Sequence, residues 1–308
     1  MKEEPLVSII IPCFNSEKTI TDAVNSILAQ TYSNYEIIIV DDASTDKTQE
    51  ICLKLSGENN KIKYFRLEVN SGGPSYPSNF GVSKSNGDYV AFLDHDDEWL
   101  PEKLKKQISF LVENNFDMAS CYILSFGNGK EQILKIIQKP PYLGEILQRN
   151  FLTSLSTIVI KKDIFEKIGG FDTVLKGPQD WDFYINFFTK GFNFGYIKEV
   201  LAKHINLKNS LSSTTSFDRF EKDRLYMFNK YVNFYKKDNK VFSNYLRSVG
   251  IQYLSLNRKN EALKMMYESI KKNPFNFKSY LYIPIISSTK LFRILLSLKI
   301  KITNAIKK

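Results

Sequence analysis

The 308-residue sequence has few residues of the types that hold zinc or form disulfides. Its two histidines are His95 and His204, and its three cysteines, Cys13, Cys52 and Cys121, lie far apart. Such spacing matches neither a zinc motif nor a disulfide framework, and it fits a reducing compartment. No run reaches the roughly 18 apolar residues of a membrane-spanning helix. The charged N-terminal residues do not resemble a signal peptide, so we expect a cytoplasmic protein.

Acidic residues are scarce in the C-terminal quarter of the chain. Residues 236–308 hold sixteen Lys and Arg against three acids, a net charge of +13 within a total of +10. The rest of the chain therefore carries −3. This asymmetry predicts an anionic surface as the partner of the C-terminal region.

Glycine is absent from the turn after the first predicted strand, which reads "IIPCFNSEKTI". A dinucleotide-dependent oxidoreductase, one alternative for an α/β chain, needs a Gly-rich turn there. The sequence therefore argues against that class. A nucleic-acid-binding protein is a second alternative, because Tyr and Phe interleave with the basic residues of the tail. No named nucleic-acid motif is present, and the acidic first part argues against it.

Apolar runs of strand character alternate with helical patterns over the first 125 residues. Examples are "PLVSIIIPCFN", "YEIIIVDDAST" and "GDYVAFLDHDD". Strands that are apolar on both faces and separated by helices predict a mostly parallel α/β sheet. Ligands of such sheets bind at the carboxyl ends of the strands. The polar residues expected at that edge are Asn15, Asp41, Asp42, Asp94 and Asp96.

Three carboxylates crowd the end of the fourth predicted strand, at Asp94, Asp96 and Asp97. One could cap the next helix, and we assign that role to Asp97. The usual reason to crowd the others is a cation, and hard cations such as Mn²⁺ or Mg²⁺ take oxygen ligands. Carboxylates two positions apart project to the same side of an extended segment.

These pieces together resemble the family-2 inverting glycosyltransferases of the GT-A fold. The resemblance covers roughly residues 5–212 and rests on four motifs in order. They are "VSIIIPCFNSEKTI", "NYEIIIVDDASTDKT", "NSGGPSYPSNFGVSKSNGDYVAFLDHDDEWLPEKL" and "GGFDTVLKGPQDWDFYINFFTKG". Two positions depart from the family pattern: Ser78 stands where Arg is common, and Gln179 where Glu often precedes the catalytic Asp. The fold implied is a GT-A nucleotide-diphospho-sugar transferase fold, a mostly parallel sheet flanked by helices, with a helical C-terminal extension.

The resemblance implies a metal-dependent transfer from a nucleotide-diphosphate sugar. Asp96 then ligates Mn²⁺ or Mg²⁺, which stabilises the charge that grows on the departing diphosphate. Asp94 faces the ribose and the metal. Some relatives place a metal- or phosphate-contacting His in the loop where His204 stands. UDP-linked hexoses or N-acetylhexosamines are the expected donors, and an inactive nucleotide-sugar binder is the alternative.

Donor contacts are also expected at the ends of the first two strands. The residues assigned to the donor there are Pro12, Phe14, Asn15, Glu17 and Asp42. Simpler interpretations stay open: core packing for Phe14, a helix-dipole interaction for Glu17, and an Asx turn for the Asp pair.

Asp180 is the expected catalytic base. An inverting transfer is a direct displacement, and a positioned carboxylate can accept the proton of the attacking hydroxyl. Asp182 is the weaker candidate, because two positions along a helix it points elsewhere. His95 is expected to pack or lie at the surface, on the face opposite to the Asp pair.

Two regions are expected: a GT-A catalytic domain over 1–215 and a basic helical region over 216–308. The helical region ends in an amphipathic helix at about 289–308. Such a helix would attach the enzyme to the anionic inner face of the cell membrane, next to a saccharide or lipid-linked saccharide acceptor. Packing of this helix on its own catalytic domain is the alternative, and a homo-oligomer is also conceivable.

Overall fold

The computed structural model describes residues 4–127, 130–152, 154–205 and 217–287, which form two compact units. The first, which we call the sheet unit, comprises Met1–Ile137 and Leu152–Asp223. The second, the helical unit, comprises Gln138–Phe151 and Arg224–Lys308. Each unit is described by itself. The expected boundary at 215/216 falls among residues outside the described ranges, and the contribution of 138–151 to the helical unit was not foreseen.

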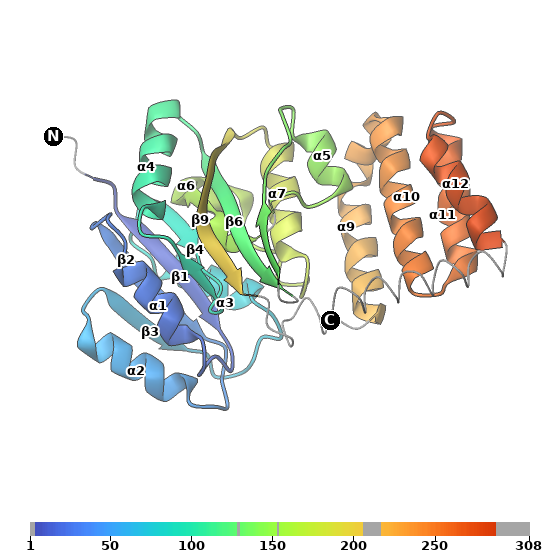
Figure 1. The fold of residues 1–308 in the computed structure, drawn as a ribbon. Helices are drawn as coiled ribbons and strands as arrows, with labels where there is room; N and C mark the ends of the chain where they lie inside the picture. Colours follow the sequence, from blue (N-terminus) through green and yellow to red (C-terminus); the bar gives the residue numbers. More distant parts are fainter. Residues whose placement is uncertain (1–3, 128–129, 153, 206–216, 288–308) are drawn as a thin grey trace. The chain divides into compact units, whose positions relative to one another are not determined.

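A mixed nine-stranded sheet organises the sheet unit (Figure 1). Its order is β3-β2-β1-β4-β8-β6-β9-β5, with β7 paired to β6. The strands are β1 (Val7–Cys13), β2 (Tyr35–Asp41), β3 (Ile62–Arg66), β4 (Tyr89–Phe92), β5 (Asp97–Trp99), β6 (Met118–Gly127), β7 (Lys130–Leu134), β8 (Val159–Lys161) and β9 (Phe194–Ile205).

The first four strands form the parallel half that the sequence predicts. β1 pairs in parallel with both β2 and β4, and β2 pairs in parallel with β3. Every residue of β1 and β2 is buried, which explains their continuous apolar runs. The other half is mixed: β8 runs antiparallel to β4 and β6, whereas β9 runs parallel to β6.

Helices cover both faces of this sheet. Buried residues of α1 (Ile20–Leu28) and α4 (Lys103–Asn114) share one core cluster with alternate residues of β1 and β2. α2 (Thr48–Glu58) contributes Cys52 to the same cluster. On the other face, α3 (Ser75–Ser83) approaches β1 closely, because a Cβ at Gly81 would lie 2.6 Å from the Ile10 side chain. An aromatic cluster joins β4 to α6 (Lys162–Ile168) and α7 (Gln179–Thr189) through Phe92, Phe165, Phe171 and Phe183.

The helical unit contains α5 (Leu143–Gln148), most of α9 (Phe217–Lys237), α10 (Asn239–Ser255), α11 (Lys259–Lys272) and α12 (Phe277–Ser287). Rings of Phe228, Tyr235, Phe242 and Tyr245 pack together where α9 meets α10. α10 and α11 are additionally joined by buried hydroxyls, since Ser243 Oγ donates to the Ser269 carbonyl at 2.7 Å. Among the described residues, no helix is both long and apolar enough to cross a membrane.

Gly87 makes the tightest backbone approach at the start of β4. A Cβ there would lie 2.6 Å from Ser8 Oγ and 2.8 Å from the Leu6 carbonyl oxygen. We expect Gly87→Ala to lower the free energy of unfolding by about 2–3 kcal/mol, because the added methyl would push backbone apart. Urea unfolding measures this. Gly57→Ala is the control: nothing lies within 4 Å of its Cβ, and Ala favours the helix by about 0.5–1 kcal/mol. Equal stability of the Gly87→Ala protein and the wild type would contradict the packing described.

Candidate active site

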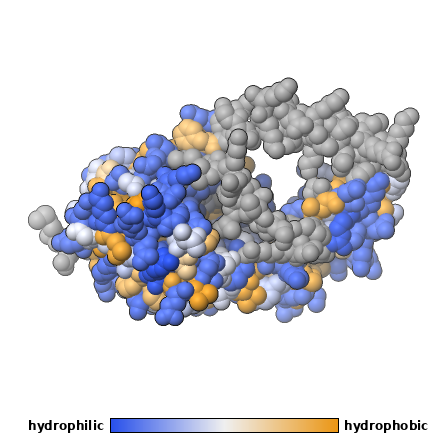
Figure 2. Space-filling model, turned by 90° about the horizontal axis from the view of Figure 1, so that it is seen from below, coloured by the Kyte–Doolittle hydropathy of each residue, from blue (hydrophilic) through white to orange (hydrophobic). Residues whose placement is uncertain are grey.

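The candidate site lies at the carboxyl ends of the parallel strands. Cys13, at the end of β1, is in register with Asp41, at the end of β2, and Asp94 follows the end of β4. Figure 2 shows the molecule from the side toward which β1, β2 and β4 point in Figure 1, and most of the coloured surface in that view is hydrophilic. The register thus gathers the acids at one edge, as expected from the sequence.

A tight turn follows β4 and carries Asp94, Asp96 and Asp97. The Asp97 amide donates to the Asp94 carbonyl at 3.0 Å, and the Asp94 amide donates to Ser156 Oγ at 3.1 Å. Ser156 Oγ in turn donates to the Asp97 carboxylate at 2.6 Å. Ser154, which is 57 positions from Asp97 in sequence, belongs to the same short segment, and its hydroxyl donates to the Asp97 carboxylate at 3.3 Å. This segment therefore fixes the geometry of the turn.

Asp97 does not cap the following helix, and our assignment of that role was wrong. Its side chain is buried in β5, and Oδ1 lies 2.7 Å from His204 Nδ1 on the paired strand β9. The residue at the start of α4 is Glu102, whose side chain makes no capping bond. Asp97 thus orients His204, and the hydrogen bond raises the pKa of His204 to about 9 despite partial burial.

Burial and mutual repulsion disfavour the charged forms of these carboxylates. Burial, followed by the charges of Asp97 and Asp96, raises the pKa of Asp94 well above its usual range. Burial and Asp97 also raise the pKa of Asp96. The negative charge of Asp180 contributes to the shift of Asp94, so α7 brings Asp180 within electrostatic range of the turn. The site is therefore short of positive charge.

The donor set suits a hard divalent cation that is shared with a substrate. In the described part of the chain, no group of three or more His, Cys, Asp or Glu side chains is arranged to hold a metal. Asp94, Asp96 and His204 thus do not form a ready three-ligand site. Mg²⁺-type sites often use one or two carboxylates and complete their sphere with substrate phosphates and water. Asp94 and Asp96 with raised pKa values fit that arrangement.

Asp180 occupies the first turn of α7, just after Pro178. It is half-buried, and its Oδ1 accepts the Trp181 amide at 2.7 Å. Asp182, the weaker candidate for the base, is only 2% exposed and thus closed to an incoming hydroxyl. Tyr184 lies one turn beyond Asp180, and burial with the charges of Asp180 and Asp94 raises its pKa. Nothing in the sequence marked this buried tyrosine as part of the site.

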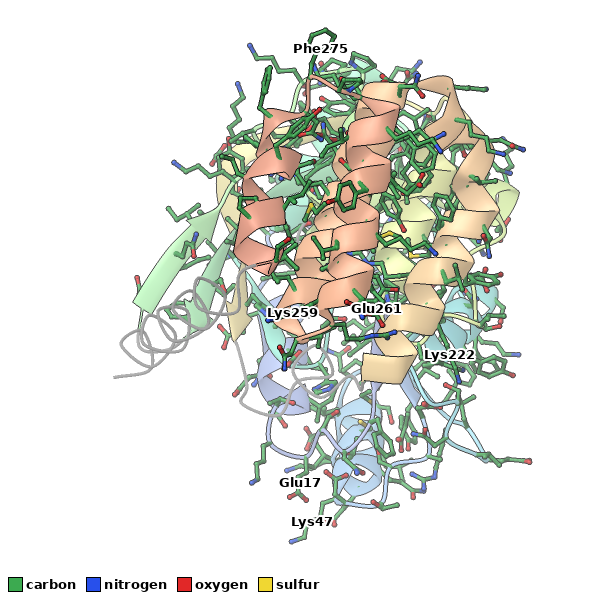
Figure 3. All side chains as sticks on the ribbon, turned by 90° about the vertical axis from the view of Figure 1, so that its right-hand side faces the viewer. Glu17, Lys47, Lys222, Lys259, Glu261 and Phe275 are labelled. Atoms are coloured by element: carbon green, nitrogen blue, oxygen red, sulfur yellow. The ribbon has the colours of Figure 1, made fainter. Side chains whose placement is uncertain are left out.

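The end of β1 is tied to the loop after β2. Asn15 has a positive φ of 50°, and its Oδ1 accepts the Thr45 amide at 2.8 Å. Glu17 Oε2 accepts the Lys47 amide at 3.1 Å (Figure 3), so it does not serve as a first-turn acid of α1, which begins at Ile20. Pro12 is buried within β1. Phe14 is 43% exposed, which rules out the core-packing interpretation and leaves its ring open to a ligand.

Asp41 and Asp42, at the end of β2, have different structural roles. Asp41 is fully buried and accepts hydrogen bonds from the Ser44 amide, the Tyr64 hydroxyl and Arg66 Nη1 at 2.7–2.8 Å. Its bond with Ser44 is the local turn that the simpler interpretation described. Asp42 instead accepts from the Ser71 amide at 2.8 Å and the Ser71 hydroxyl at 3.0 Å. Its carboxylate therefore holds the loop before α3 against the end of β2.

His95 lies between Asp94 and Asp96 in sequence, but its side chain contacts a different part of the protein. Its Nδ1 is 2.9 Å from the Thr19 hydroxyl, next to the start of α1, and burial lowers its pKa. This contact agrees with the packing role expected from the sequence.

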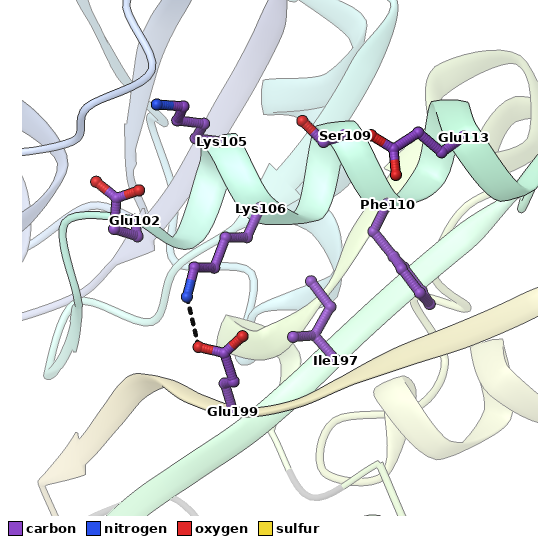
Figure 4. A pocket seen from close by; sticks show the side chains of 8 residues that line it. All are labelled: Glu102, Lys105, Lys106, Ser109, Phe110, Glu113, Ile197 and Glu199. Atoms are coloured by element: carbon purple, nitrogen blue, oxygen red, sulfur yellow. Dashed lines mark hydrogen bonds and ion pairs between the residues drawn. The ribbon is translucent and has the colours of Figure 1, made fainter.

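A separate hollow lies between α4 and β9 (Figure 4). Lys106 and Glu199 form an ion pair across it. Its lining includes none of the acidic residues of the turn after β4 and no residue of α7. We therefore assign no part of the candidate site to it.

Comparison with known proteins agrees with this fold and site. The model of the family described as glycosyl transferase family 2 matches residues 8–172. An uncharacterized glycosyltransferase of Rickettsia typhi is 32% identical over 225 residues, which are 70% of this chain and 69% of the relative. TuaG of Bacillus subtilis, a glycosyltransferase named for teichuronic acid biosynthesis, is 32% identical over 68% of this chain and 82% of its own.

Solved structures show the same fold. TarS 1–349 of S. aureus in complex with UDP-GlcNAc aligns with a TM-score of 0.66 and 23% identity, over 86% of this chain and 81% of that chain. Against the longer TarS structure, the chain covers 49% of that chain's length. The protein belongs to glycosyl transferase family 2, and the predicted family and GT-A fold are confirmed.

Proposed function

We propose that the protein is a metal-dependent inverting glycosyltransferase that moves a sugar from a UDP-linked donor to a hydroxyl of a saccharide or lipid-linked saccharide. The observation that carries the proposal is the grouping of Asp94 and Asp96 with Asp180 at one edge of the sheet. The UDP-GlcNAc complex of TarS and the polysaccharide role in the name of TuaG support the donor and acceptor classes. The acceptor belongs, in this proposal, to surface polysaccharide or glycan synthesis.

Asp180 acts as the base in this mechanism. The acceptor oxygen forms a bond to the anomeric carbon while the bond from that carbon to the diphosphate oxygen breaks. The acceptor proton passes to the Asp180 carboxylate, and the nucleoside diphosphate leaves. Half-burial keeps Asp180 reachable from solvent while lowering the water content around it.

Asp94 and Asp96 would hold Mn²⁺ or Mg²⁺ together with donor phosphates. Members of this family are commonly metal-dependent. The bound cation would supply positive charge where negative charge grows on the leaving group. His204 stays the proposed third side chain, because its Nδ1 is bonded to the Asp97 carboxylate, as the second ring nitrogen of a metal-ligating histidine commonly is. Metal binding would displace the proton that the raised pKa of His204 favours. Pro12, Phe14, Asn15, Glu17 and Asp42 would shape the pocket for the nucleoside.

The stereochemical outcome is a direct test of this mechanism. A single displacement with one base predicts that an α-linked donor gives a β-linked product. The anomeric proton coupling in NMR of the product distinguishes the two linkages. An α-linked product would show retention of the anomeric configuration and would reject the inverting single displacement.

Membrane attachment through residues 289–308 also stays a proposal, because these residues lie outside the described ranges. It rests on the charge of the C-terminal region and on the amphipathic pattern of that segment. Flotation of the full chain with anionic vesicles at low salt, and weaker flotation after truncation before Ser288, would support this role of 289–308.

A further inference from the structure

The last described helix, α12, turns an apolar stripe away from its own unit. Its exposed residues recur at the i, i+3, i+4 and i+7 spacing that normally faces a core. They are Phe277, Tyr280, Leu281 and Pro284. Phe277 is 71% exposed and Leu281 66% exposed. The opposite side of α12 is apolar as well, because Ile286 is buried in the core of the helical unit and Tyr282 and Ile283 pack against that core.

Polar residues hold α12 in this orientation. Asn276 is buried, and its Nδ2 donates to Ser243 Oγ at 2.8 Å. One turn later, the buried Ser279 hydroxyl lies 2.8 Å from Ser269 Oγ. Asn276 and Ser279 point inward together with Ile286, so Phe277, Tyr280 and Leu281 lie on the outward side. The exposure of the stripe thus follows from the packing of the unit.

The turn before α12 extends the stripe. Asn273 Oδ1 accepts the Phe275 amide at 3.1 Å, and the Phe277 amide donates to the Phe275 carbonyl at 2.9 Å. These bonds fix a compact turn whose two phenylalanines flank the buried Asn276. Phe275 is 80% exposed and stands at one end of the helical unit, opposite to Lys259 (Figure 3).

The charge around the stripe has one sign. Lys271, four positions before Phe275, and Lys278, next to Phe277 in sequence, are exposed, and no acidic residue follows Glu268 in the chain. Residues 224–287 contain twelve Lys and Arg against three acids, a net charge of +9. A second copy of the helical unit would carry the same positive charge, so the two copies would repel each other at this surface. Residues 288–308, with six Lys and Arg and no acid, would be repelled in the same way.

We propose that the stripe, extended by Phe275 and accompanied by the exposed Lys271 and Lys278, binds a bilayer surface that contains anionic lipid. Aromatic and aliphatic side chains enter the boundary between headgroups and acyl chains, and the lysines contact the headgroups. This attachment point lies within the described residues and does not depend on 289–308. It goes beyond the proposed function, because it would hold whatever sugar the site transfers.

The test uses the full-length chain and vesicles of phosphatidylcholine with about one third phosphatidylglycerol. The Phe275→Ala/Phe277→Ala protein is expected to bind about 10- to 100-fold more weakly than the wild type, since it loses the area of two aromatic side chains. Tyr267→Ala is the matched control, because Tyr267 is 57% exposed on α11 but is not part of the stripe. Vesicles of phosphatidylcholine alone should bind the wild type at least about tenfold more weakly.

A fluorescent probe reports insertion directly. The native tryptophans, Trp99 and Trp181, are buried at 3% and 6% exposure, so their emission should not respond to vesicles. Phe277→Trp is expected to shift its emission to shorter wavelength on binding, and Tyr267→Trp is not. Undiminished binding of the double variant, equal binding to both vesicle types, or no shift for Phe277→Trp would overturn the proposal. If the wild type forms a dimer and the double variant does not, the stripe binds a second copy of the chain, and the membrane proposal is overturned. Donor turnover is measured in a separate assay, so an absence of turnover would contradict only the proposed function and not the membrane proposal.

Discussion

Asp180→Asn is expected to lower kcat by about 10²- to 10⁴-fold, the usual contribution of a general base. Asparagine keeps the shape of the side chain and can still accept the Trp181 amide that Asp180 Oδ1 binds. It cannot accept the proton of the acceptor hydroxyl. The Kd of the donor should therefore change little. The measurements are kcat and the donor Kd of the variant, and we expect a lowered kcat with a nearly unchanged Kd.

The neighbouring acid supplies the control for this variant. Asp182→Asn changes the same charge two positions away, on a side chain that is 2% exposed. We expect it to affect thermal stability more than kcat. Wild-type kcat in Asp180→Asn, together with loss of kcat in Asp182→Asn at unchanged stability, would move the base to Asp182.

Asp96→Ala is expected to abolish measurable transfer, because the proposed cation would lose its most direct protein ligand. An excess of chelator should have the same effect on the wild type, and Mn²⁺ or Mg²⁺ should restore it. Asp163→Ala removes an acid on α6 that pairs with Lys167 on the surface, and it should leave turnover unchanged. Full turnover of the wild type in excess chelator would contradict metal dependence.

Stability gives an independent measure of the same site. The raised pKa of Asp96 means that its charged form is disfavoured in the fold, so this group costs stability as pH rises above the unfolded value near 3.9. Without metal, Asp96→Ala should therefore unfold at a higher temperature than the wild type at pH 7. Metal at about 100 times its Kd should raise the melting temperature of the wild type by about 5–10 °C and that of the variant much less. Equal metal-induced shifts in both proteins would place the cation elsewhere.

The parallel half of the sheet was predictable because its signals are local. β1 and β2 are apolar along their whole length, each is followed by a helical pattern, and the parallel register then brings Cys13 and Asp41 side by side. The other half depends on pairing between distant segments. β8 is a three-residue strand that runs antiparallel to two neighbours, and no periodicity can show that from so few residues.

The candidate site could be proposed from the sequence where its residues stand in one motif, and its contacts were missed where distant segments meet. Asp94, Asp96 and Asp180 stand in recognisable motifs. The role of Asp97 depends on Ser156 and on His204, which are 59 and 107 positions away in sequence. A helix cap was the nearest local explanation, and a cross-strand pair between β5 and β9 replaced it. The Ser71 contact of Asp42 has the same origin, since it joins loops that sequence spacing does not relate.

One measurement tests the central claim most directly: release of nucleoside diphosphate from a panel of nucleotide sugars by the purified full-length protein with Mn²⁺ and a saccharide acceptor. The mechanism predicts that UDP is released from at least one UDP-hexose or UDP-N-acetylhexosamine. It also predicts that Asp180→Asn and Asp96→Ala lose this release while the Asp180→Asn protein still binds the same donor. Donor binding without turnover in the wild type would instead identify an inactive nucleotide-sugar binder. Equal turnover in the wild type and both variants would contradict the site described above.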